Sequence, residues 1–347
     1  MLWSVLLTLI FFSVIVFVHE FGHFFVARLF KISVNEFAIG MGPKIFSKEK
    51  NGTVYSLRAI PLGGFCSLEG EDSVSEDTEG AFSQKPWYAR LLVLVAGAAM
   101  NLVLGFLISV VFVSVFYSSS GIPTTTVDSV MEQSSLYDVL KPGDRIVRLN
   151  EYNIKIKKDL DFAMQQSGGG ECEIEVVRGG ESFVRTFKPI EAQYTDGTPA
   201  YLVGIVPKIQ SVNIGTVLRE SFYQTVWMGK LVFVSLKMLL GGQAKITEVS
   251  GPVGVVEAMN TQAQTGGFVA LLYLAGFLSV NIGIMNLLPI PALDGGRILF
   301  VIIEAIRRKP IPPEKEGLVH FAGLVLLLGF MVFVTWNDIV RLVSAYF

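Results

Sequence analysis

Two histidines and a glutamate stand in the pattern His19-Glu20-Phe21-Gly22-His23, which is suited to binding a metal ion. Residues four apart on a helix project from nearly the same face, so both imidazoles can bind one ion, and Glu20 can reach a water on that ion. Zinc in such a site lowers the pKa of its water to about 7, and the carboxylate takes the proton as hydroxide attacks a carbonyl. The motif therefore predicts metal-assisted hydrolysis.

A catalytic zinc usually has three protein ligands and one open position, so the two histidines need a third partner. Asp294 is the strongest carboxylate candidate, because it ends an uncharged run at a proline-rich stretch and precedes two glycines. Irregular backbone of this kind is tolerated inside a membrane only where it lines a cavity. His320 is a rival or additional ligand; its alternatives are a boundary residue or a structural hydrogen-bond partner. The predicted cofactor is Zn²⁺.

The composition places most of the chain in a bilayer. Of 347 residues, 51% are hydrophobic and 17% charged, and the mean hydropathy is +0.54, which is too apolar for an ordinary soluble chain. A net charge of -2 leaves no basic surface for nucleic acid, so we expect no nucleic-acid partner. The two cysteines, Cys66 and Cys172, are too far apart in sequence for a Cys-rich metal site, and we expect them to face different compartments without forming a disulfide.

Four apolar stretches are long enough to cross a hydrocarbon core, which takes roughly 20 helical residues. They cover residues 2–30, 91–117, 268–293 and 318–336. The first stretch has no basic segment before it and no cleavage site after it, so we expect it to stay uncleaved. The predicted fold class is a multi-pass α-helical membrane protein with four transmembrane helices. Ionisable residues in a span usually face a functional interior cavity, which favours the metal-site interpretation of the first stretch.

The expected topology follows from the Lys and Arg residues, which gather between the first two stretches and after the third. Both connections should be cytoplasmic, which places the N-terminus, the 118–267 region and the C-terminus outside. Ser221–Leu240 is also apolar, but Lys230 and Lys237 share one helical face, so we expect an interfacial helix. This agrees with the metal site, because His19, His23 and Asp294 meet at one depth only if this segment does not span.

Two regions have strand character instead. Glu36–Phe46 and Thr53–Ile60 flank Asn51-Gly52, which predicts a membrane-associated β-hairpin against the bundle at its cytoplasmic side. From 124 to about 208, short alternating runs separated by turn signals predict a small strand-rich domain with one short helix over 159–166. The predicted organisation is 1–118 for the first part of the membrane core, 119–209 for the inserted extracytoplasmic domain, and 210–347 for the interfacial helix and the last two spans.

The motifs together resemble the site-2 protease family of intramembrane zinc metalloproteases, in its bacterial branch of the regulator of sigma-E protease type. HExxH lies in the first span, and a second motif lies far along the chain, with a domain inserted between the two motifs. The second motif is Asn286-x-x-Pro289-x-Pro291-x-Leu293-Asp294-Gly295. The resemblance implies that His19, His23 and Asp294 bind zinc and that Glu20 is the catalytic acid and base. It also implies a multi-pass protein of the bacterial cytoplasmic (inner) membrane, with its active site toward the cytoplasm.

The resemblance extends to substrate binding. It implies that Asn281 and Asn286 hold the substrate backbone or the oxyanion, although hydrogen bonding between helices is the alternative for both. It implies too that the edge at Gly63, Gly64 and Phe65 adds a substrate strand, which would satisfy the backbone of an unwound helix. The inserted domain looks like a PDZ domain over Leu140–Asn150. The preceding Ser134-Ser135-Leu136 departs from the pattern of relatives. The domain therefore has two possible roles, binding the C-terminus of a peptide or acting as a size filter over the active site.

The implied function is proteolysis within the membrane, on single-span proteins such as anti-sigma factors or leftover signal peptides. One alternative is a membrane-anchored protease acting on soluble chains, which would need a soluble catalytic domain that the connection of about sixty residues between the first two spans cannot supply. Another is a metal transporter or a non-catalytic membrane chaperone. Transporters tend to show inverted repeats, and the sequence shows none between its halves.

Overall fold

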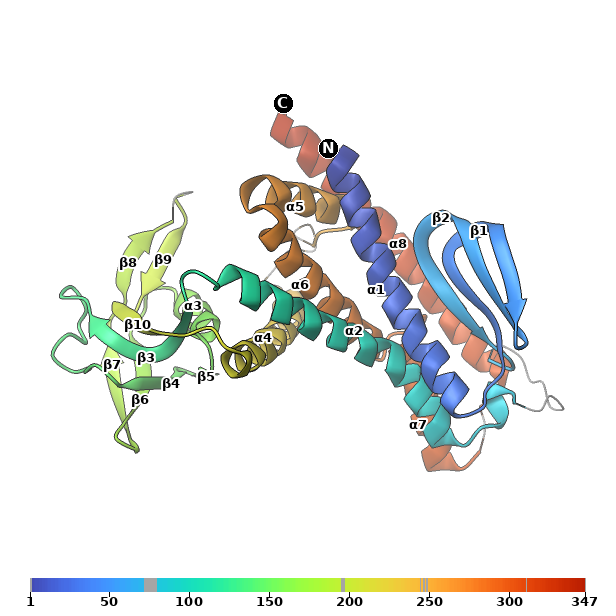
Figure 1. The fold of residues 1–347 in the computed structure, drawn as a ribbon, viewed down its shortest axis with the longest axis horizontal. Helices are drawn as coiled ribbons and strands as arrows, with labels where there is room; N and C mark the ends of the chain where they lie inside the picture. Colours follow the sequence, from blue (N-terminus) through green and yellow to red (C-terminus); the bar gives the residue numbers. More distant parts are fainter. Residues whose placement is uncertain are drawn as a thin grey trace. The chain divides into compact units, whose positions relative to one another are not determined.

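Four helices of the part of the chain that the structure describes are long and apolar enough to cross a membrane, as the sequence predicts. The computed structural model describes residues 2–71, 80–194, 197–243, 245, 247, 249–309 and 311–346. The four helices are α1 (Leu2–Leu29), α2 (Trp87–Phe116), α6 (Gly267–Leu287) and α8 (Pro313–Tyr346), and Figure 1 shows them. They make the chain a multi-pass membrane protein.

The third apolar stretch is not one continuous helix. The uncharged run to residue 293 is helical only as far as Leu287, where α6 ends, and Leu288 takes an extended conformation with ψ 144°. This agrees with the irregular backbone expected at the prolines. Proline disfavours helical geometry in the residue before it, and Pro289 follows directly. A short loop then leads to α7 (Asp294–Arg307). Asp294 is therefore the first residue of a new helix.

Two further helices complete the helical part. α4 (Ile214–Leu240) contains the predicted interfacial segment and is not among the four candidate spans. α5 (Pro252–Thr265) begins with proline in its first turn. One carboxylate oxygen of Asp338, a buried residue of α8, accepts hydrogen bonds from the backbone N–H of Gly251 at 2.9 Å and Gly254 at 2.7 Å. Because the N-terminal N–H groups of a helix lack partners within it, this carboxylate fixes α8 to the start of α5.

The chain forms two compact units, one of Met1–Ile108 with Met228–Phe347 and one of Ser109–Trp227. The first unit holds the hairpin of β1 (Val34–Lys50) and β2 (Thr53–Leu68). Asn51 and Gly52 both have positive φ, 52° and 72°, as the tight turn between paired strands requires. The hairpin is confirmed, with strands longer than the sequence pattern indicates.

The hairpin folds back on itself, which creates a second edge. Residues 36–39 pair with 54–57 on one side and with 64–67 on the other. The segment Gly64–Leu68 has only the 34–39 segment as a strand partner among the described residues. Its other side is therefore an open strand edge, the usual place for an added strand.

The second unit contains the predicted strand-rich domain with its short helix α3 (Lys157–Gln166). Its main sheet has the order β10-β3-β4-β6-β7, with β5 on β4, and a separate pair joins β8 to β9. The strands are β3 (Ile122–Val130), β4 (Arg145–Leu149), β5 (Tyr152–Asn153), β6 (Cys172–Arg178), β7 (Glu181–Phe187), β8 (Ile190–Gln193), β9 (Pro199–Leu202) and β10 (Ile205–Gln210).

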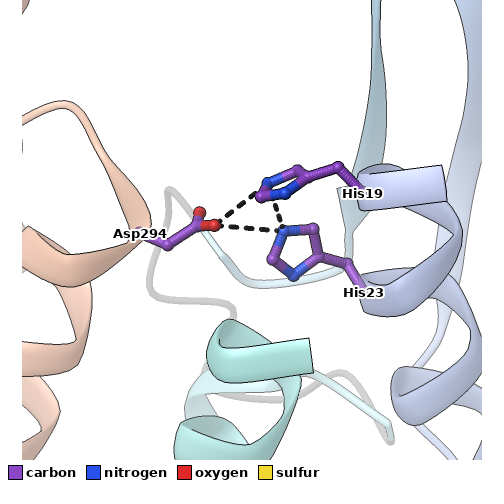
Figure 2. Close-up of side chains that lie close together, drawn as sticks. All are labelled: His19, His23 and Asp294. Atoms are coloured by element: carbon purple, nitrogen blue, oxygen red, sulfur yellow. Dashed lines mark hydrogen bonds and ion pairs between the residues drawn. The ribbon is translucent and has the colours of Figure 1, made fainter. Parts of the chain in front are cut away.

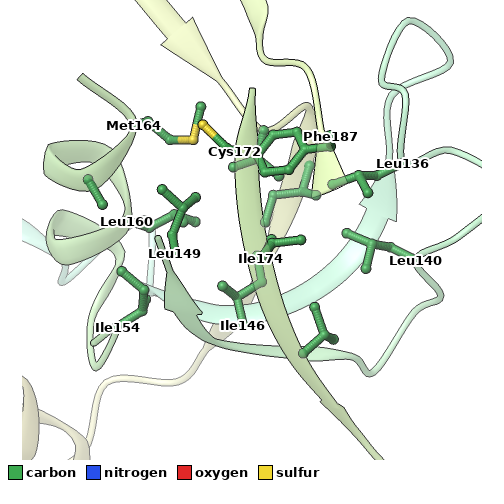
Figure 3. Close-up of a cluster of buried hydrophobic side chains, with 14 of the residues drawn as sticks. Leu136, Leu140, Ile146, Leu149, Ile154, Leu160, Met164, Cys172, Ile174 and Phe187 are labelled. Carbon is green, nitrogen blue, oxygen red and sulfur yellow. The ribbon is translucent and has the colours of Figure 1, made fainter. Parts of the chain in front are cut away.

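A single apolar core holds this domain together. Figure 3 shows Ile146, Leu149 and Ile174 of the sheet packed with Leu160 and Met164 of α3, all almost fully buried. The turn before β4 is closed by Asp144, which is buried, accepts from the Lys141 N–H and receives two 2.7 Å hydrogen bonds from Arg178. The Arg178 hydrogen bonds hold the pKa of Asp144 below its usual value, so the carboxylate stays charged.

Candidate active site

The structure brings His19, His23 and Asp294 together, and Figure 2 shows the three side chains converging. Asp294 Oδ2 lies 3.1 Å from Nε2 of His19 and 3.3 Å from Nε2 of His23. The two Nε2 atoms are 3.2 Å apart. The ligand atoms of a tetrahedral zinc ion, with bonds of about 2.0–2.1 Å, are separated by roughly 3.3–3.4 Å. The donor types and their spacing therefore fit Zn²⁺.

The outer nitrogen of each imidazole faces a polar group that fixes the ring. Nδ1 of His23 lies 2.9 Å from the carbonyl oxygen of Val93, so Nδ1–H donates and the Nε2 lone pair points at Asp294. Nδ1 of His19 lies 3.4 Å from the amide nitrogen of Asn101. Asn101 is fully buried and its Oδ1 has no hydrogen-bond partner. Rotating the side-chain amide by about 180° would place Oδ1 where it can accept a hydrogen bond from Nδ1–H of His19.

Asn101 was not among the residues predicted for the site. The available signal was a carboxamide in the middle of an uncharged span, because polar groups at such positions need a reason to be there. Its backbone oxygen accepts a 2.8 Å hydrogen bond from Ser279 Oγ of α6. Asn101 therefore joins α2 to α6 at the level of the histidines.

Glycines allow α1 and α2 to approach at the histidines. A Cβ added to Gly97 of α2 would overlap Nε2 of His23 and lie 2.8 Å from Cε1 of His19. A Cβ on Gly22 of α1 would overlap the carbonyl oxygen of Ala96. Small residues let two membrane helices pack backbone to backbone. The space that the two imidazoles occupy therefore depends on glycine at 97.

The loop before Asp294 is held by α8. Ala292 has φ +72°, a left-handed conformation that is unusual for alanine, and its N–H donates to Nδ1 of His320 at 3.0 Å. Gly323, one turn further along α8, packs on Pro291 so closely that a Cβ would lie 2.8 Å from the Pro291 carbonyl carbon. His320 is thus a hydrogen-bond partner of the loop and stands outside the three-residue group.

An ion pair positions the rest of α7. Glu304 accepts a 2.6 Å hydrogen bond from Arg90 of α2 and a 2.8 Å hydrogen bond from the N–H of Ile311. Both charged side chains are mostly buried. A buried pair of this kind is sensitive to loss of either partner, so it fixes α7 against α2.

Glu20 and the hairpin edge face the same cavity, which has a volume of about 310 Å³. It is lined by Glu20, His23, Phe65, Cys66, Ser67, Leu68, Glu71, Val93, Leu94, Asp294 and Arg297. The backbone of Cys66 lies beside the Glu20 carboxylate. A Cβ on Gly64 would lie 3.7 Å from Cγ of Glu20. The open strand edge and the glutamate therefore lie side by side.

The other predicted substrate residues are placed differently. Gly63, at φ +81°, packs against the side chain of Met41 instead of lining the cavity. Asn281 and Asn286 belong to α6 and are half-buried, and neither lies among the cavity residues. Gly64 lies beside Glu20 and Phe65 lines the same cavity, whereas Gly63, Asn281 and Asn286 are not among its lining residues. The substrate-binding role of the two asparagines stays a prediction.

Three cavity residues carry no sequence signal of their own. Arg297 follows Asp294 by one helical turn and forms an ion pair with Glu71. Burial and the nearby Glu20 raise the pKa of the Cys66 thiol. Both cysteines of the chain are free.

Comparisons with known proteins cover almost the whole chain. Residues 7–330 match the family model described as Peptidase family M50. A Clostridium acetobutylicum protein is 35% identical over 342 residues, which cover 97% of this chain and 98% of that protein. Zinc metalloprotease RasP of Oceanobacillus iheyensis is 32% identical and regulator of sigma-W protease RasP of Bacillus subtilis 30%, each covering 98% of this chain and 99% of the relative.

A solved PDZ domain, from an SdrC-like protein of Listeria monocytogenes, is similar to part of the chain at 23% identity. It covers 24% of this chain and 87% of that domain, with a TM-score of 0.21. The peptidase family match and the full-length relatives agree with the geometry of the site. In that site, a group of possible metal ligands, a glutamate and a strand edge lie around one cavity. The chain belongs to peptidase family M50.

Proposed function

We propose that this chain is an intramembrane zinc metalloprotease, which hydrolyses peptide bonds within or next to the transmembrane segment of single-span membrane proteins. The observation that carries the proposal is one cavity shared by Glu20, two members of the ligand group and an open strand edge. Ionisable side chains within an apolar membrane helix usually serve a function, and these are suited to hydrolysis of a peptide bond inside the membrane.

His19, His23 and Asp294 would hold the zinc ion. When bound, zinc supplies a Lewis acid that lowers the pKa of water and polarises a carbonyl oxygen. The Glu20 carboxylate faces the cavity, where it would accept a proton from the attacking water. The same carboxyl group would then deliver that proton to the leaving amide nitrogen, so the proton count balances.

The edge at Gly64–Leu68 would bind the substrate as an added strand. A transmembrane helix hides its carbonyl groups in its own hydrogen bonds, so it must unwind before one of them reaches the catalytic groups. Unwinding leaves backbone groups without partners, and a neighbouring strand edge satisfies them. The closeness of Gly64 to Glu20 supports this placement.

The substrates that we propose are anti-sigma factors or remnants of signal peptides. The Bacillus subtilis relative is named a regulator of sigma-W protease, which supports membrane proteins of a signalling pathway. We also propose that the N-terminus, the inserted domain and the C-terminus are extracytoplasmic, with the active site toward the cytoplasm. The inserted domain would then restrict access to substrates already trimmed outside.

The test is a comparison of Glu20→Gln and Asp294→Asn in the full chain, purified in detergent. Glu20→Gln should retain zinc and lose cleavage of a model single-span substrate by about 10²–10⁴-fold, because only proton transfer is removed. Asp294→Asn should lose zinc as well as cleavage. Normal turnover by Glu20→Gln would refute the assigned base, and full zinc content in Asp294→Asn would refute the ligand set.

A further inference from the structure

A second, larger cavity lies between α1 and the hairpin, with a volume of about 540 Å³. Phe17, Phe21 and Phe24 form its α1 wall, on a stripe that points roughly away from the stripe of His19 and His23. The hairpin wall is Phe37, Ile39, Phe46, Lys48, Lys50, Tyr55, Ser56 and Leu57. This cavity is therefore distinct from the one that holds Glu20.

The cavity runs along the direction that a lipid chain takes. At one end, Lys50 pairs with Thr53, whose hydroxyl receives a hydrogen bond from Arg28 in the last turn of α1. A basic residue at the end of an apolar span marks the level of the lipid headgroups. Phe17 stands eleven residues before Arg28, about 16 Å along the helix axis. That length matches half of a hydrocarbon core of about 30 Å.

The side chains that line the cavity change from apolar to basic between its deep end and its headgroup end. The deep end is aromatic and aliphatic, whereas Lys48 and Lys50 stand at the headgroup end with exposed side chains. Neither ammonium group forms an ion pair with any residue that the structure describes. Two unpaired cations above an apolar slot complement a phosphate joined to a hydrocarbon chain.

The charge at the headgroup end distinguishes the possible occupants of the cavity. An apolar membrane helix offers no anion to Lys48 and Lys50, whereas the phosphate of an anionic phospholipid does. A single acyl chain is thinner than a helix and needs no hydrogen-bond partners. We propose that this cavity binds one acyl chain of an anionic phospholipid, whose phosphate lies at Lys48 and Lys50.

A lipid seated here would pack between α1 and the strands that continue to the catalytic edge. Residues 36–39 line or adjoin this cavity and also pair with 64–67. The bound chain would therefore support the sheet from the side opposite the proposed substrate. This binding site does not depend on the proposed proteolysis, and it is tested by binding alone.

The experiment uses the full chain, freed of lipid in dodecyl maltoside and titrated with phosphatidylglycerol or phosphatidylcholine, with bound lipid counted by native mass spectrometry. We expect one phosphatidylglycerol to bind roughly tenfold to thirtyfold more tightly than phosphatidylcholine, because each lysine near a headgroup favours an anion. Lys48→Gln with Lys50→Gln should abolish that preference. Leu57→Trp, which fills the slot, should reduce binding of both lipids.

The matched control is Lys188→Gln with Lys208→Gln, which removes two exposed charges from the inserted domain and should keep the preference. Thermal unfolding followed by circular dichroism verifies that each variant is folded. An unchanged preference in the Lys48 and Lys50 variant, or unchanged binding in Leu57→Trp, would overturn the proposal. So would displacement of the lipid by glycerol phosphate, which has no acyl chain, or by a polyleucine helix, which would identify a peptide site.

Discussion

Ala292 sets the direction of the neighbouring Asp294 from a backbone conformation that alanine rarely adopts. Such a residue costs on the order of 1 kcal/mol or more and persists only where its surroundings hold it. The structure supplies two such contacts from α8, the hydrogen bond to His320 and the packing of Gly323 on Pro291. The placement of Asp294, the third proposed metal ligand, therefore depends on two residues of α8 outside the three-residue group.

We expect His320→Ala to weaken zinc binding about 10- to 100-fold, the range found when a group supporting a ligand is lost. Glycine adopts positive φ without strain, so adding Ala292→Gly should restore most of the affinity. Competition with a zinc chelator on the purified chain measures both effects. Phe321→Ala, at an exposed neighbouring position, is the control. If Ala292→Gly gives no recovery, His320 acts only through general stability.

Several side chains at the site could be identified from sequence because their types and spacing carry the chemistry. His19, Glu20 and His23 lie within one turn of a helix, and Asp294 stands beside prolines and glycines that interrupt a span. Cys66 and Arg297 could not be identified, because their proximity to the site comes from packing of distant segments. Asn101 offered only the weak signal of a carboxamide in an uncharged span, and its contact with His19 depends on how α1 and α2 pack. The substrate role of Asn281 and Asn286, which rests on family resemblance alone, stays a prediction.

Among the elements, the contact of α1 with α2 limits what the site can accept. Gly97→Ala should lower zinc affinity at least tenfold and reduce cleavage, because the new methyl group would overlap the His23 imidazole. Equilibrium zinc content after dialysis measures the effect. Gly329→Ala in α8 is a matched control, because nothing lies near its added Cβ. Full zinc content in Gly97→Ala would show that the helices can separate without loss of the site.

The hairpin contains its own acid-sensitive contact. Burial alone would raise the pKa of Glu36, but hydrogen bonds from Ser56, Arg58 and Lys44 lower it to about 2. The folded pKa is below the unfolded value, so the stabilisation is present above about pH 4.5 and is lost as the pH falls toward 2. Glu36→Gln should therefore reduce the free energy of unfolding by about 1 kcal/mol at pH 7.

Thermal unfolding in detergent at pH 7 and near pH 3 measures this effect. The difference between wild type and Glu36→Gln should shrink at the lower pH, because Glu36 of the unfolded chain binds a proton there while the folded carboxylate stays largely ionised. Glu49→Gln changes an exposed glutamate of the same hairpin and should have little effect at either pH. An equal loss at both pH values would contradict the role of the charge.

Local patterns predicted most elements but not how they combine. The Asn51-Gly52 turn and the four apolar runs are local signals, and the structure has the hairpin and four candidate spans. The return of 64–67 to pair with 36–39 depends on a fold-back that no local pattern specifies. The break at Leu288 is another local signal, because Pro289 disfavours a helical conformation in the residue before it.

For the molecule as a whole, the charge distribution predicts the side of the membrane on which each part lies. In a chain with Cys66→Ser and Cys172→Ser, Ser182→Cys of the inserted domain should react with an impermeant maleimide in intact cells. Ser83→Cys, between the hairpin and α2, should react only after permeabilisation, because basic residues keep that connection inside. Both serines are exposed. The reverse labelling pattern would invert the proposed topology.

The anchoring of the Asp294 loop by α8 has a consequence for synthesis on the ribosome. A nascent chain that has released only α1 presents two imidazoles, and the aspartate emerges after most of the polypeptide has been made. Even then, Ala292 and Pro291 lack their contacts until His320 and Gly323 have followed. The proposed ligand group therefore takes its final arrangement only after the first turns of α8 have been made, late in the synthesis of the chain.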